Sequence, residues 1–467
     1  MASSSLGISR SECSALSWES GPGRGYESDG NPAQSARISW TNGLQFVDSE
    51  VRFIIDTFSF LVWGGLVMWM CAGFTMLEAG SVRTRNASVI CLKNIGSLSI
   101  AALAFHFVGY GFMFEGVEEG GWIGSFDFFH GITDAEKALL GGDSSSAARV
   151  VENGHASMSY WLFQMVFVAS TASIVSGTLA ERVRLWSYFI FVAVLTAVIY
   201  PVIGAWTWGG GWLAAMGFQD FAGSTVVHST GGWAALAGVL VVGARRGKFL
   251  DDGTVKPTPP NSIPEVTLGV SVIWLGFLGF NGGSQLALGG AIDAVAVATV
   301  LANTNLAGAA GVVAAMLLSR PVFGRIDLLA SLNGAIAGLV AITAGPDLVG
   351  HGWAVVIGAI GGALCLLGMK LLERLRIDDE VGAIPAHMGA GVWGTMAVCI
   401  AAGGDPLVQL IGIAAVGATV FGASLFVWRI IDSTLGARIS PRVERLGQDS
   451  AELGIESFPE FVLAEDD

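Results

Sequence analysis

The sequence predicts an all-α integral membrane protein of about eleven transmembrane helices. Of its 467 residues, 52% are hydrophobic and only 13% are charged, whereas a soluble domain carries about 25% charged residues. Glycine occupies 65 positions, and small residues let helices pack closely in lipid. The apolar stretches at 190–205 and 306–318 lack the alternation that a β-barrel strand needs. These observations favour a bundle of membrane-spanning helices.

Each predicted span is long enough to cross about 30 Å of hydrocarbon. The spans start near residues 53, 88, 158, 185, 222, 263, 291, 326, 352, 384 and 408. We expect the first ten to form two sets of five. Because five is odd, the second set runs opposite to the first, which is the inverted-repeat arrangement common in transporters. The eleventh span is a final helix outside the repeats.

The distribution of basic residues predicts the orientation, because cytoplasmic loops collect Lys and Arg. If the N-terminus is outside, the basic residues that fall outside the inner loops are confined to the N-terminal tail and the first outer loop. These are Arg10, Arg24, Arg37, Arg52, Lys137 and Arg149. With an odd number of spans, the C-terminus is then cytoplasmic.

Composition divides the chain into three parts. Residues 1–50 form a polar tail that is expected to be flexible and does not resemble a secretory signal. Residues 51–431 form the membrane domain, and residues 432–467 form a charged cytoplasmic tail. The outer loop at 115–152 has eight acidic and two basic residues. It either raises the local concentration of a cation or is simply solvated.

The five cysteines are scattered and predict neither a disulfide framework nor a metal site. They are Cys13, Cys71, Cys91, Cys365 and Cys399. No cofactor is expected from the sequence.

Ionisable side chains inside spans are costly and often functional. Away from the span ends we find His106, His228 and His387. His106 is better explained by a hydrogen bond between helices than by a site. His228 and His387 occupy the last span of each predicted repeat and are flanked by small residues. Two neutral imidazoles can share one proton, between the Nδ1 atoms or between the Nε2 atoms, and line a path for a small hydrogen-bonding solute.

Aromatic residues form a second candidate group near the outer ends of the spans. Phe163 and Phe167 share one helix face, Trp208 begins a glycine-rich turn, and Phe280 precedes a turn that ends at Ser284. Singly, each is more typical of packing or of an interfacial belt. Together they can form a cation–π cup worth about 0.5–2 kcal/mol.

Asp220 lies in the outer turn before the fifth span. Its carboxylate is placed to accept hydrogen bonds from the free N–H groups of that helix. We expect a capping role that supports the site, to which its charge adds some attraction for a cation.

Five segments together identify a known family. They are Ala180-Glu181-Arg182-Val183-Arg184, Trp208-Gly209-Gly210-Gly211, Asp220-Phe221-Ala222-Gly223-Ser224-Thr225-Val226-Val227-His228, Gly279-Phe280-Asn281-Gly282-Gly283-Ser284 and Ile377-Asp378-Asp379. With these segments the chain resembles the ammonium transporters of the Amt/Mep/Rh superfamily, on the Amt side. The resemblance runs from about residue 53 into the C-terminal tail.

The resemblance implies roles for individual residues. It implies that Phe163, Phe167, Trp208 and Ser284 recruit ammonium at the outer face, and that Phe167 and Phe280 form a stacked gate. It also implies that His228 and His387 are the twin histidines of the pore.

The resemblance further implies a multi-pass protein of the cell membrane, surrounded by lipid. The expected assembly is a homotrimer with one pore per subunit, and the expected regulator is a PII-type signalling protein at the cytoplasmic face. The chain departs from the family pattern at Gly382, where many bacterial members have an aspartate, and at Leu453-Gly454, where His-Gly is common. Both departures bear on PII regulation more than on conduction.

The resemblance and elementary acid–base chemistry together predict a transport mechanism. An ammonium-like nitrogen has a pKa near the lysine value of about 10.4, so the substrate is charged at neutral pH. A dry constriction favours its deprotonation. We therefore expect ammonium or methylammonium to be recruited outside, deprotonated, and passed as the neutral amine along the histidines.

Two other functions compete with transport, and neither is an enzyme activity. An ammonium sensor would have little flux. No kinase or cyclase domain supports it, since only about 35 residues follow the last span. A gas channel of the Rh side is disfavoured because Trp208 and Ser284 are retained.

Overall fold

The computed structural model describes the backbone of residues 32–459 and the side chains of residues 48–459. Residues 1–31 and 460–467 lie outside the described part, so the predicted flexible N-terminal tail and the end of the predicted cytoplasmic tail stay predictions. Helix α1 begins at Pro32, earlier than the predicted start near residue 53. Contacts divide the chain into residues 1–48 and a compact unit, Ser49–Asp467, to which the following description refers.

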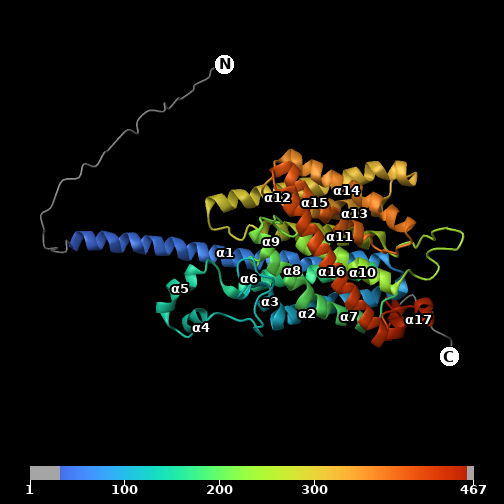
Figure 1. Ribbon diagram of the computed structural model, residues 1–467, viewed down its shortest axis with the longest axis horizontal. Coiled ribbons are helices and arrows are strands. Elements are labelled where there is room, and N and C mark those ends of the chain that lie inside the picture. The colour runs from blue at the N-terminus through green and yellow to red at the C-terminus, as the bar shows by residue number, and fades with distance from the viewer. Residues whose placement is uncertain (1–31, 460–467) are drawn as a thin grey trace, which may run out of the picture. The chain divides into compact units, whose positions relative to one another are not determined.

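The described residues confirm the all-α class and contain no strand. The helices that begin the chain are α1 (Pro32–Ser81), α2 (Ala87–Ala104), α3 (Tyr110–Phe114), α4 (Asp134–Leu140), α5 (Ala147–Glu152), α6 (Ser157–Thr178), α7 (Leu185–Val194), α8 (Tyr200–Thr207) and α9 (Trp212–Ala215). They are followed by α10 (Thr230–Val242), α11 (Ile263–Gly283), α12 (Ala291–Phe323), α13 (Leu328–Ile342), α14 (His351–Arg374), α15 (Ala390–Ala402), α16 (Pro406–Thr434) and α17 (Pro441–Leu446). The long helices lie side by side with their axes near the horizontal in Figure 1.

Ten helical stretches in the described part are long and apolar enough to span a membrane. They are Asp48–Ser81, Thr84–Phe114, Ser144–Thr178, Leu185–Ala215, Ser224–Val242, Ile263–Gly283, Ala291–Phe323, His351–Arg374, Ile384–Ala402 and Pro406–Thr434. The remaining predicted span corresponds to α13, which has only 15 residues. The number of spans and the sidedness of the termini stay predictions.

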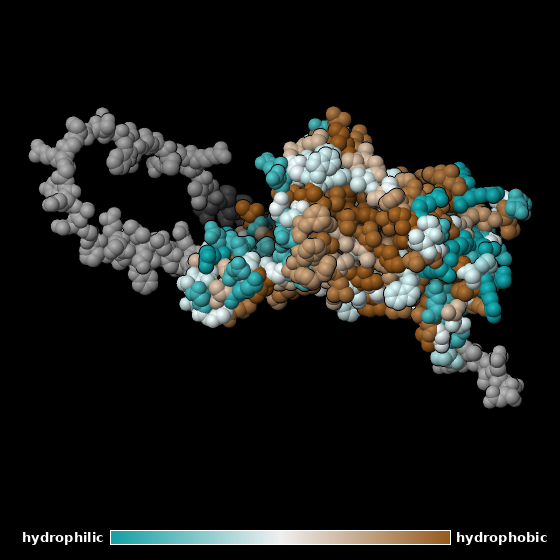
Figure 2. Space-filling model, turned by 60° about the horizontal axis from the view of Figure 1, so that its bottom comes forward, coloured by the Kyte–Doolittle hydropathy of each residue, from teal (hydrophilic) through white to brown (hydrophobic). Residues whose placement is uncertain are grey.

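The surface is that of a membrane protein. On the face shown in Figure 2, hydrophobic side chains gather across the middle and hydrophilic ones at both ends. Large side chains such as Phe58, Leu103 and Trp186 are 65%, 70% and 75% exposed. Apolar surface on this scale needs lipid or a protein partner to cover it. The interior is held by aromatic packing, for example between Phe191 and Trp428, whose rings stack 4.5 Å apart.

The stretches Ser224–Val242 and Ile384–Ala402, which are the predicted fifth and tenth spans, cross and run antiparallel. Each begins with a π-helical turn, η5 (Ser224–Ser229) before α10 and η6 (Ile384–Gly389) before α15. The hydroxyl oxygens of Thr225 and Thr395 are 2.6 Å apart, and Gly232 faces Met388. The beginning of each span therefore lies beside a later part of the other, as two inverted repeats require.

Gly232 permits this crossing because a Cβ at that position would lie 2.5 Å from the Cβ of Met388. We expect Gly232→Ala to force the two spans apart and to lower the free energy of unfolding by about 1–3 kcal/mol, measured by thermal unfolding in detergent. Gly422 in α16 has no atom within 4 Å of its ideal Cβ, so Gly422→Ala is the matched control and should not destabilise. Equal effects of the two substitutions would contradict close packing at the crossing.

Candidate functional site

The structure brings the four predicted recruitment residues together at one pocket. Phe163 and Phe167 come from α6, Trp208 follows α8, and Ser284 follows α11. The pocket is lined by Tyr160, Phe163, Gln164, Phe167, Trp208, Phe221, Ser284 and Leu286. We call this the outer pocket, and its side of the protein the outer face, in keeping with the predicted orientation.

Backbone oxygens orient the two polar groups of the outer pocket. The indole N–H of Trp208 donates to the carbonyl oxygen of Asp220 at 2.9 Å, and the hydroxyl of Ser284 donates to the carbonyl oxygen of Phe280 at 2.8 Å. Because each donor is already used, the Ser284 oxygen is left to accept from a ligand and Trp208 presents its ring. A hydroxyl acceptor and an aromatic face suit a small N–H-bearing cation.

Two stacked rings close the inner end of the outer pocket. Phe167 and Phe280 lie 3.9 Å apart between ring centroids, with 25° between their planes. Both side chains are buried, at 1% and 0% exposure. Trp208 meets Phe167 edge-on at 5.9 Å. The two rings are therefore in direct contact at this end of the pocket.

The two histidines lie directly beyond this stack. The His228 ring stacks on Phe280 at 5.1 Å and on Phe277 at 5.2 Å. Nδ1 of His228 is 3.3 Å from Nδ1 of His387, so one imidazole donates and the other accepts. The Nε2 atom of His228 has no partner among the described residues. The pair therefore keeps one ring nitrogen as a donor and one as an acceptor for a solute.

Asp220 holds the helix that carries His228. Its carboxylate accepts hydrogen bonds from the backbone N–H groups of Gly223, Thr225 and Val226 at 3.2, 2.9 and 2.8 Å. Burial raises the pKa of Asp220 to about 6, although these hydrogen bonds favour the ionised form. Because Trp208 donates to the backbone of the same residue, Asp220 connects the outer pocket to the histidine pair.

Asp379 plays the same part for the other histidine. The sequence marked it only as part of the segment Ile377-Asp378-Asp379 and gave it no role. Its carboxylate accepts from the N–H groups of Ala383 and Ile384 at 3.2 and 2.8 Å, and burial raises its pKa to about 6. It lies eight residues before His387, as Asp220 lies eight before His228. That equal spacing was the available signal. Gly382, the departure noted above, has a φ of +75°, which suits glycine.

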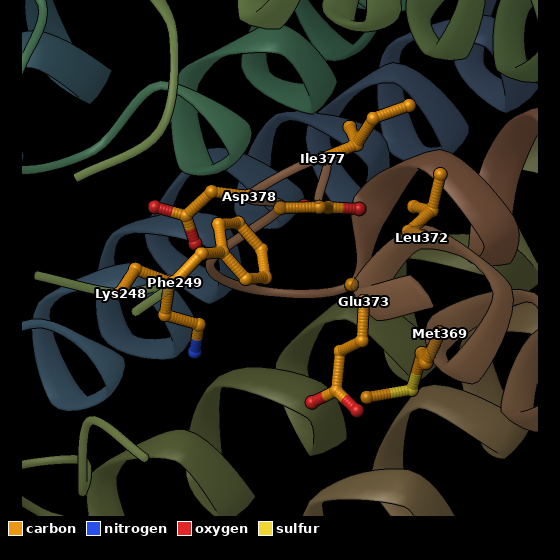
Figure 3. Close-up of a pocket in the computed structure, with 9 residues that line it drawn as sticks. Lys248, Phe249, Met369, Leu372, Glu373, Ile377 and Asp378 are labelled. Atoms are coloured by element: carbon orange, nitrogen blue, oxygen red, sulfur yellow. The ribbon is translucent and has the colours of Figure 1, made fainter. Parts of the chain in front are cut away.

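A second pocket lies beneath this turn. Figure 3 shows it between the chain at Lys248 and Phe249 and the end of α14, with Asp378 beside Phe249. Asp379 and Gly382 also line it. It therefore reaches the helix start that carries His387.

His106 does not make the hydrogen bond expected of it. Its buried Nδ1 atom has no partner among the described residues. The ring instead meets Trp161 edge-on at 5.5 Å and Phe129 at 6.2 Å. Tyr110, four residues further along the chain, packs against His130 at 3.8 Å. His106 is thus held by aromatic packing.

Two further ionisable residues in the spans were missed. Glu78 in α1 and Lys93 in α2 are each 1% exposed, with Lys93 Nζ 3.8 Å from Glu78 Oε2. Both residues lie near the ends of their helices. For that reason the sequence placed Lys93 among the basic residues of the inner loops. Only the packing of α2 against α6 shows that it is buried.

Comparison with known proteins shows which family the chain resembles over most of its length. A model of the Ammonium Transporter Family matches residues 58–458. Ammonium transporter Amt2 of Archaeoglobus fulgidus is 37% identical over 91% of this chain and 92% of its own length. A putative ammonium transporter of Synechocystis is 38% identical over 87% of this chain and 90% of its own.

The chain belongs to the ammonium transporter family.

Solved structures extend the likeness to three dimensions. A structure titled Sensor Amt Protein superposes with a TM-score of 0.78 at 33% identity, over 86% of this chain and 99% of that one. Mep2 of Saccharomyces cerevisiae superposes with a TM-score of 0.73 at 25% identity, over 84% of this chain and 90% of that one. This member of the ammonium transporter family is accordingly a multi-pass membrane protein.

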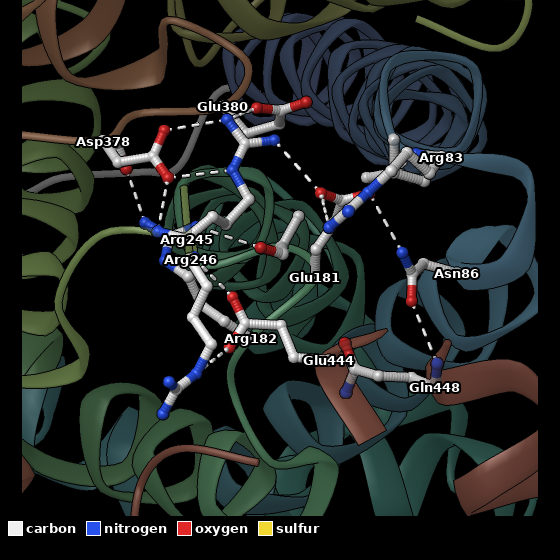
Figure 4. A network of polar contacts seen from close by, with 12 residues as sticks. Arg83, Asn86, Glu181, Arg182, Arg245, Arg246, Asp378, Glu380, Glu444 and Gln448 are labelled. Atoms are coloured by element: carbon white, nitrogen blue, oxygen red, sulfur yellow. Dashed lines mark hydrogen bonds and ion pairs between the residues drawn. The ribbon is translucent and has the colours of Figure 1, made fainter. Parts of the chain in front are cut away.

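In this transporter-family chain, an ion-pair network joins the loops of the face opposite the outer pocket, which we call the inner face (Figure 4). Arg245 pairs with Asp378 at 2.8 Å, with Glu181 at 3.2 Å and with Glu380. Arg83 pairs with Glu181 at 2.8 Å. Burial raises the pKa of Glu181, but Arg83 and Arg245 lower it by more, to about 2.

The segment after α16 docks onto this network. The Glu444 carboxylate accepts from the N–H of Arg246 at 2.7 Å and pairs with Arg438 at 2.9 Å. Asp449 accepts from the first N–H groups of α2, at Ser88 and Val89. The inner loops and the C-terminal segment therefore form one connected structure.

Asp220 should make stability depend on pH. Its folded-state pKa of about 6 exceeds the unfolded value of about 3.9, so its stabilising contribution is present at pH 4 and is lost as the pH rises through 6. Measured against Asp220→Asn, which does not titrate, the wild-type free energy of unfolding should fall by about 1–3 kcal/mol between pH 4 and pH 7. If thermal unfolding shows that the stability of the wild type relative to Asp220→Asn increases with pH, the raised pKa of Asp220 is contradicted.

Arg245 should be essential to the inner-face network. Arg245→Met leaves buried carboxylates at Glu181, Asp378 and Glu380 without their shared cation, and we expect a loss of about 3–5 kcal/mol of stability. The matched control is Lys137→Met, because Lys137 pairs with Asp134 on the surface with 61% of its side chain exposed. The control should cost less than about 1 kcal/mol. Thermal unfolding of the purified proteins separates the two outcomes.

Proposed function

We propose that this protein transports ammonium, and methylammonium, across the membrane by binding the cation in the outer pocket and passing the neutral amine along His228 and His387. The observation that carries the proposal is the unbroken column of contacts from Trp208 through Phe167 and Phe280 to the two imidazoles. No charged side chain lies in that column. A cation cannot follow it without losing its charge.

Deprotonation follows from the change of surroundings along the column. In the half-buried outer pocket, ring faces and the Ser284 hydroxyl stabilise the cation. At the Phe167/Phe280 stack both rings are buried, so loss of hydration favours the neutral form of the solute. Beyond the stack, His228 and His387 offer a donor and an acceptor to ammonia and a relay for the proton.

Selectivity follows from the same two steps. Potassium shares the charge that the outer pocket favours, but it has no proton to give up at the stack. Water can enter a pore but lacks the charge that the outer pocket selects.

The assembly and its regulation are part of the proposal. Family resemblance supports a homotrimer in the cell membrane, and the exposed apolar side chains give it surface to bury. A PII-type protein would act at the inner face, where the pocket of Figure 3 opens beside Lys248 and Phe249.

A sensor function is the second candidate, since one structural neighbour with 33% identity is titled Sensor Amt Protein. A sensor needs binding without much flux. The C-terminal segment that docks on the inner loops offers a route by which occupancy of the pore is coupled to the tail.

The decisive measurement is current on solid-supported membranes that carry proteoliposomes, after a step of ammonium, methylammonium or potassium. We expect saturable current for the first two and none for potassium. Trp208→Ala should weaken recruitment and lower the current at least tenfold at low ammonium. The double variant His228→Ala/His387→Ala should change both the current and its selectivity.

Matched controls separate site effects from general damage. Trp186→Ala removes an indole that is 75% exposed on α7. His351→Ala removes an imidazole at the start of α14 that is hydrogen-bonded to Asn303 and lines neither the outer pocket nor the histidine pair. Both should leave current intact. Absence of current together with measured ammonium binding, and no uptake of labelled methylammonium, would replace transport by the sensor function.

A further inference from the structure

A small inner pocket lies on the other side of the histidine pair. It is lined by Phe74, Leu77, Glu78, Ser173, Ile174, Gly177, Asn333, Ile336, Val381, Ala383 and His387. The Phe74 ring lies 6.2 Å from the His387 ring. Any solute that passes the histidines enters this pocket before it reaches the inner face.

The inner pocket is the repeat-related counterpart of the outer pocket. On α11, Phe280 covers His228 and is followed four residues later by Ser284. On α1, Phe74 covers His387 and is followed four residues later by Glu78. Helices α1 and α11 are the first spans of the two predicted repeats. Glu78 therefore occupies the position that corresponds to the Ser284 hydroxyl.

Glu78 brings a reactive group to that position. Its Oε2 atom accepts from the Ser176 hydroxyl at 2.6 Å, whereas its Oε1 atom is buried and has no donor among the described residues. Gly177 leaves space for this side chain, since a Cβ there would lie 3.1 Å from the Glu78 Cγ. The pocket thus has a carboxyl oxygen available to a ligand.

Lys93 balances the charge of this carboxyl from behind. Its Nζ is 3.8 Å from Oε2 of Glu78, donates to the carbonyl oxygen of Ser176 at 2.7 Å, and lies 5.3 Å from the centre of the Tyr188 ring. The Asn94 amide N–H donates to the carbonyl oxygen of Ile90 at 3.3 Å. A lone buried carboxylate would hold a cation tightly. With Lys93 beside it, the pair is neutral overall, so a cation formed in the pocket can leave.

We propose that Glu78 is the proton-exchange group at the inner end of the pore, where it returns a proton to ammonia and releases ammonium, with Lys93 as the residue that sets its charge. The inference rests on the proposed transport function. The Glu78 O–H bond breaks and an N–H bond of ammonium forms. The carboxylate then regains its proton from the His387 imidazolium, which receives through His228 the proton given up by ammonium, and both imidazoles end neutral.

The test compares current with luminal pH in proteoliposomes that contain a pH-sensitive dye. If the proton is returned inside the pore, wild type gives ammonium current without luminal alkalinisation. Glu78→Gln/Lys93→Met removes both charges together, so neither is left buried alone. We expect its current to fall at least tenfold while alkalinisation appears, because ammonia still passes. Asp134→Asn/Lys137→Met, at a pair whose side chains are both exposed, is the matched control and should behave like wild type.

The outcomes distinguish this inference from the proposed function. An undiminished current in the Glu78/Lys93 double variant would overturn the inference and leave transport standing. The same conclusion would follow if the wild-type protein alkalinised the lumen without giving a current. Wild-type protein with neither signal would overturn transport itself. If the double variant is not monodisperse, Glu78→Asp withdraws the free oxygen but keeps the charge. It should lower the current, and an unchanged current would again reject the role of Glu78.

Discussion

The antiparallel crossing of the fifth and tenth spans is the arrangement on which the site depends. Two imidazoles reach 3.3 Å between their Nδ1 atoms only because the helices that carry them approach closely, at positions such as Gly232. Both rings are buried, at 0% and 2% exposure, and a charged imidazole would be costly there. The crossing therefore produces a pair that is neutral at rest, hydrogen-bonded to itself, and able to offer one donor and one acceptor to a neutral solute.

The ends of the crossing helices are stabilised in the same way. Each begins with a π-helical turn, and an aspartate eight residues before the histidine accepts the free backbone N–H groups. At the outer end, Asp220 also receives the Trp208 N–H through its carbonyl oxygen. At the inner end, Asp379 is adjacent to Asp378, which belongs to the ion-pair network of Arg245. The two histidines are thus positioned by different surroundings, although their local geometry is alike.

The two pockets differ in chemistry despite their related geometry. The outer one combines aromatic rings with a neutral hydroxyl, which suits capture of a cation from water. The inner one has a carboxyl group next to a lysine, which suits proton exchange and release. Inverted repeats place functional groups at corresponding positions, and here the two positions carry different groups, a hydroxyl at Ser284 and a carboxyl at Glu78.

The sequence by itself determined the membrane-spanning class and the approximate position of the spans, and it singled out the two histidines that meet and the aromatic residues that line the outer pocket. It could do so because hydrophobic length, glycine content and a specific set of segments are local properties of the chain. It did not reveal Asp379, although its spacing from His387 matches that of Asp220 from His228, and it assigned His106 a hydrogen bond that its Nδ1 does not make. Only the tertiary structure decided that the imidazoles meet through Nδ1, that Lys93 is buried against Glu78, and that Glu78 faces the pocket of His387. These are contacts between helices distant in sequence, and their burial, which fixes charge and reactivity, exists only once the helices have packed.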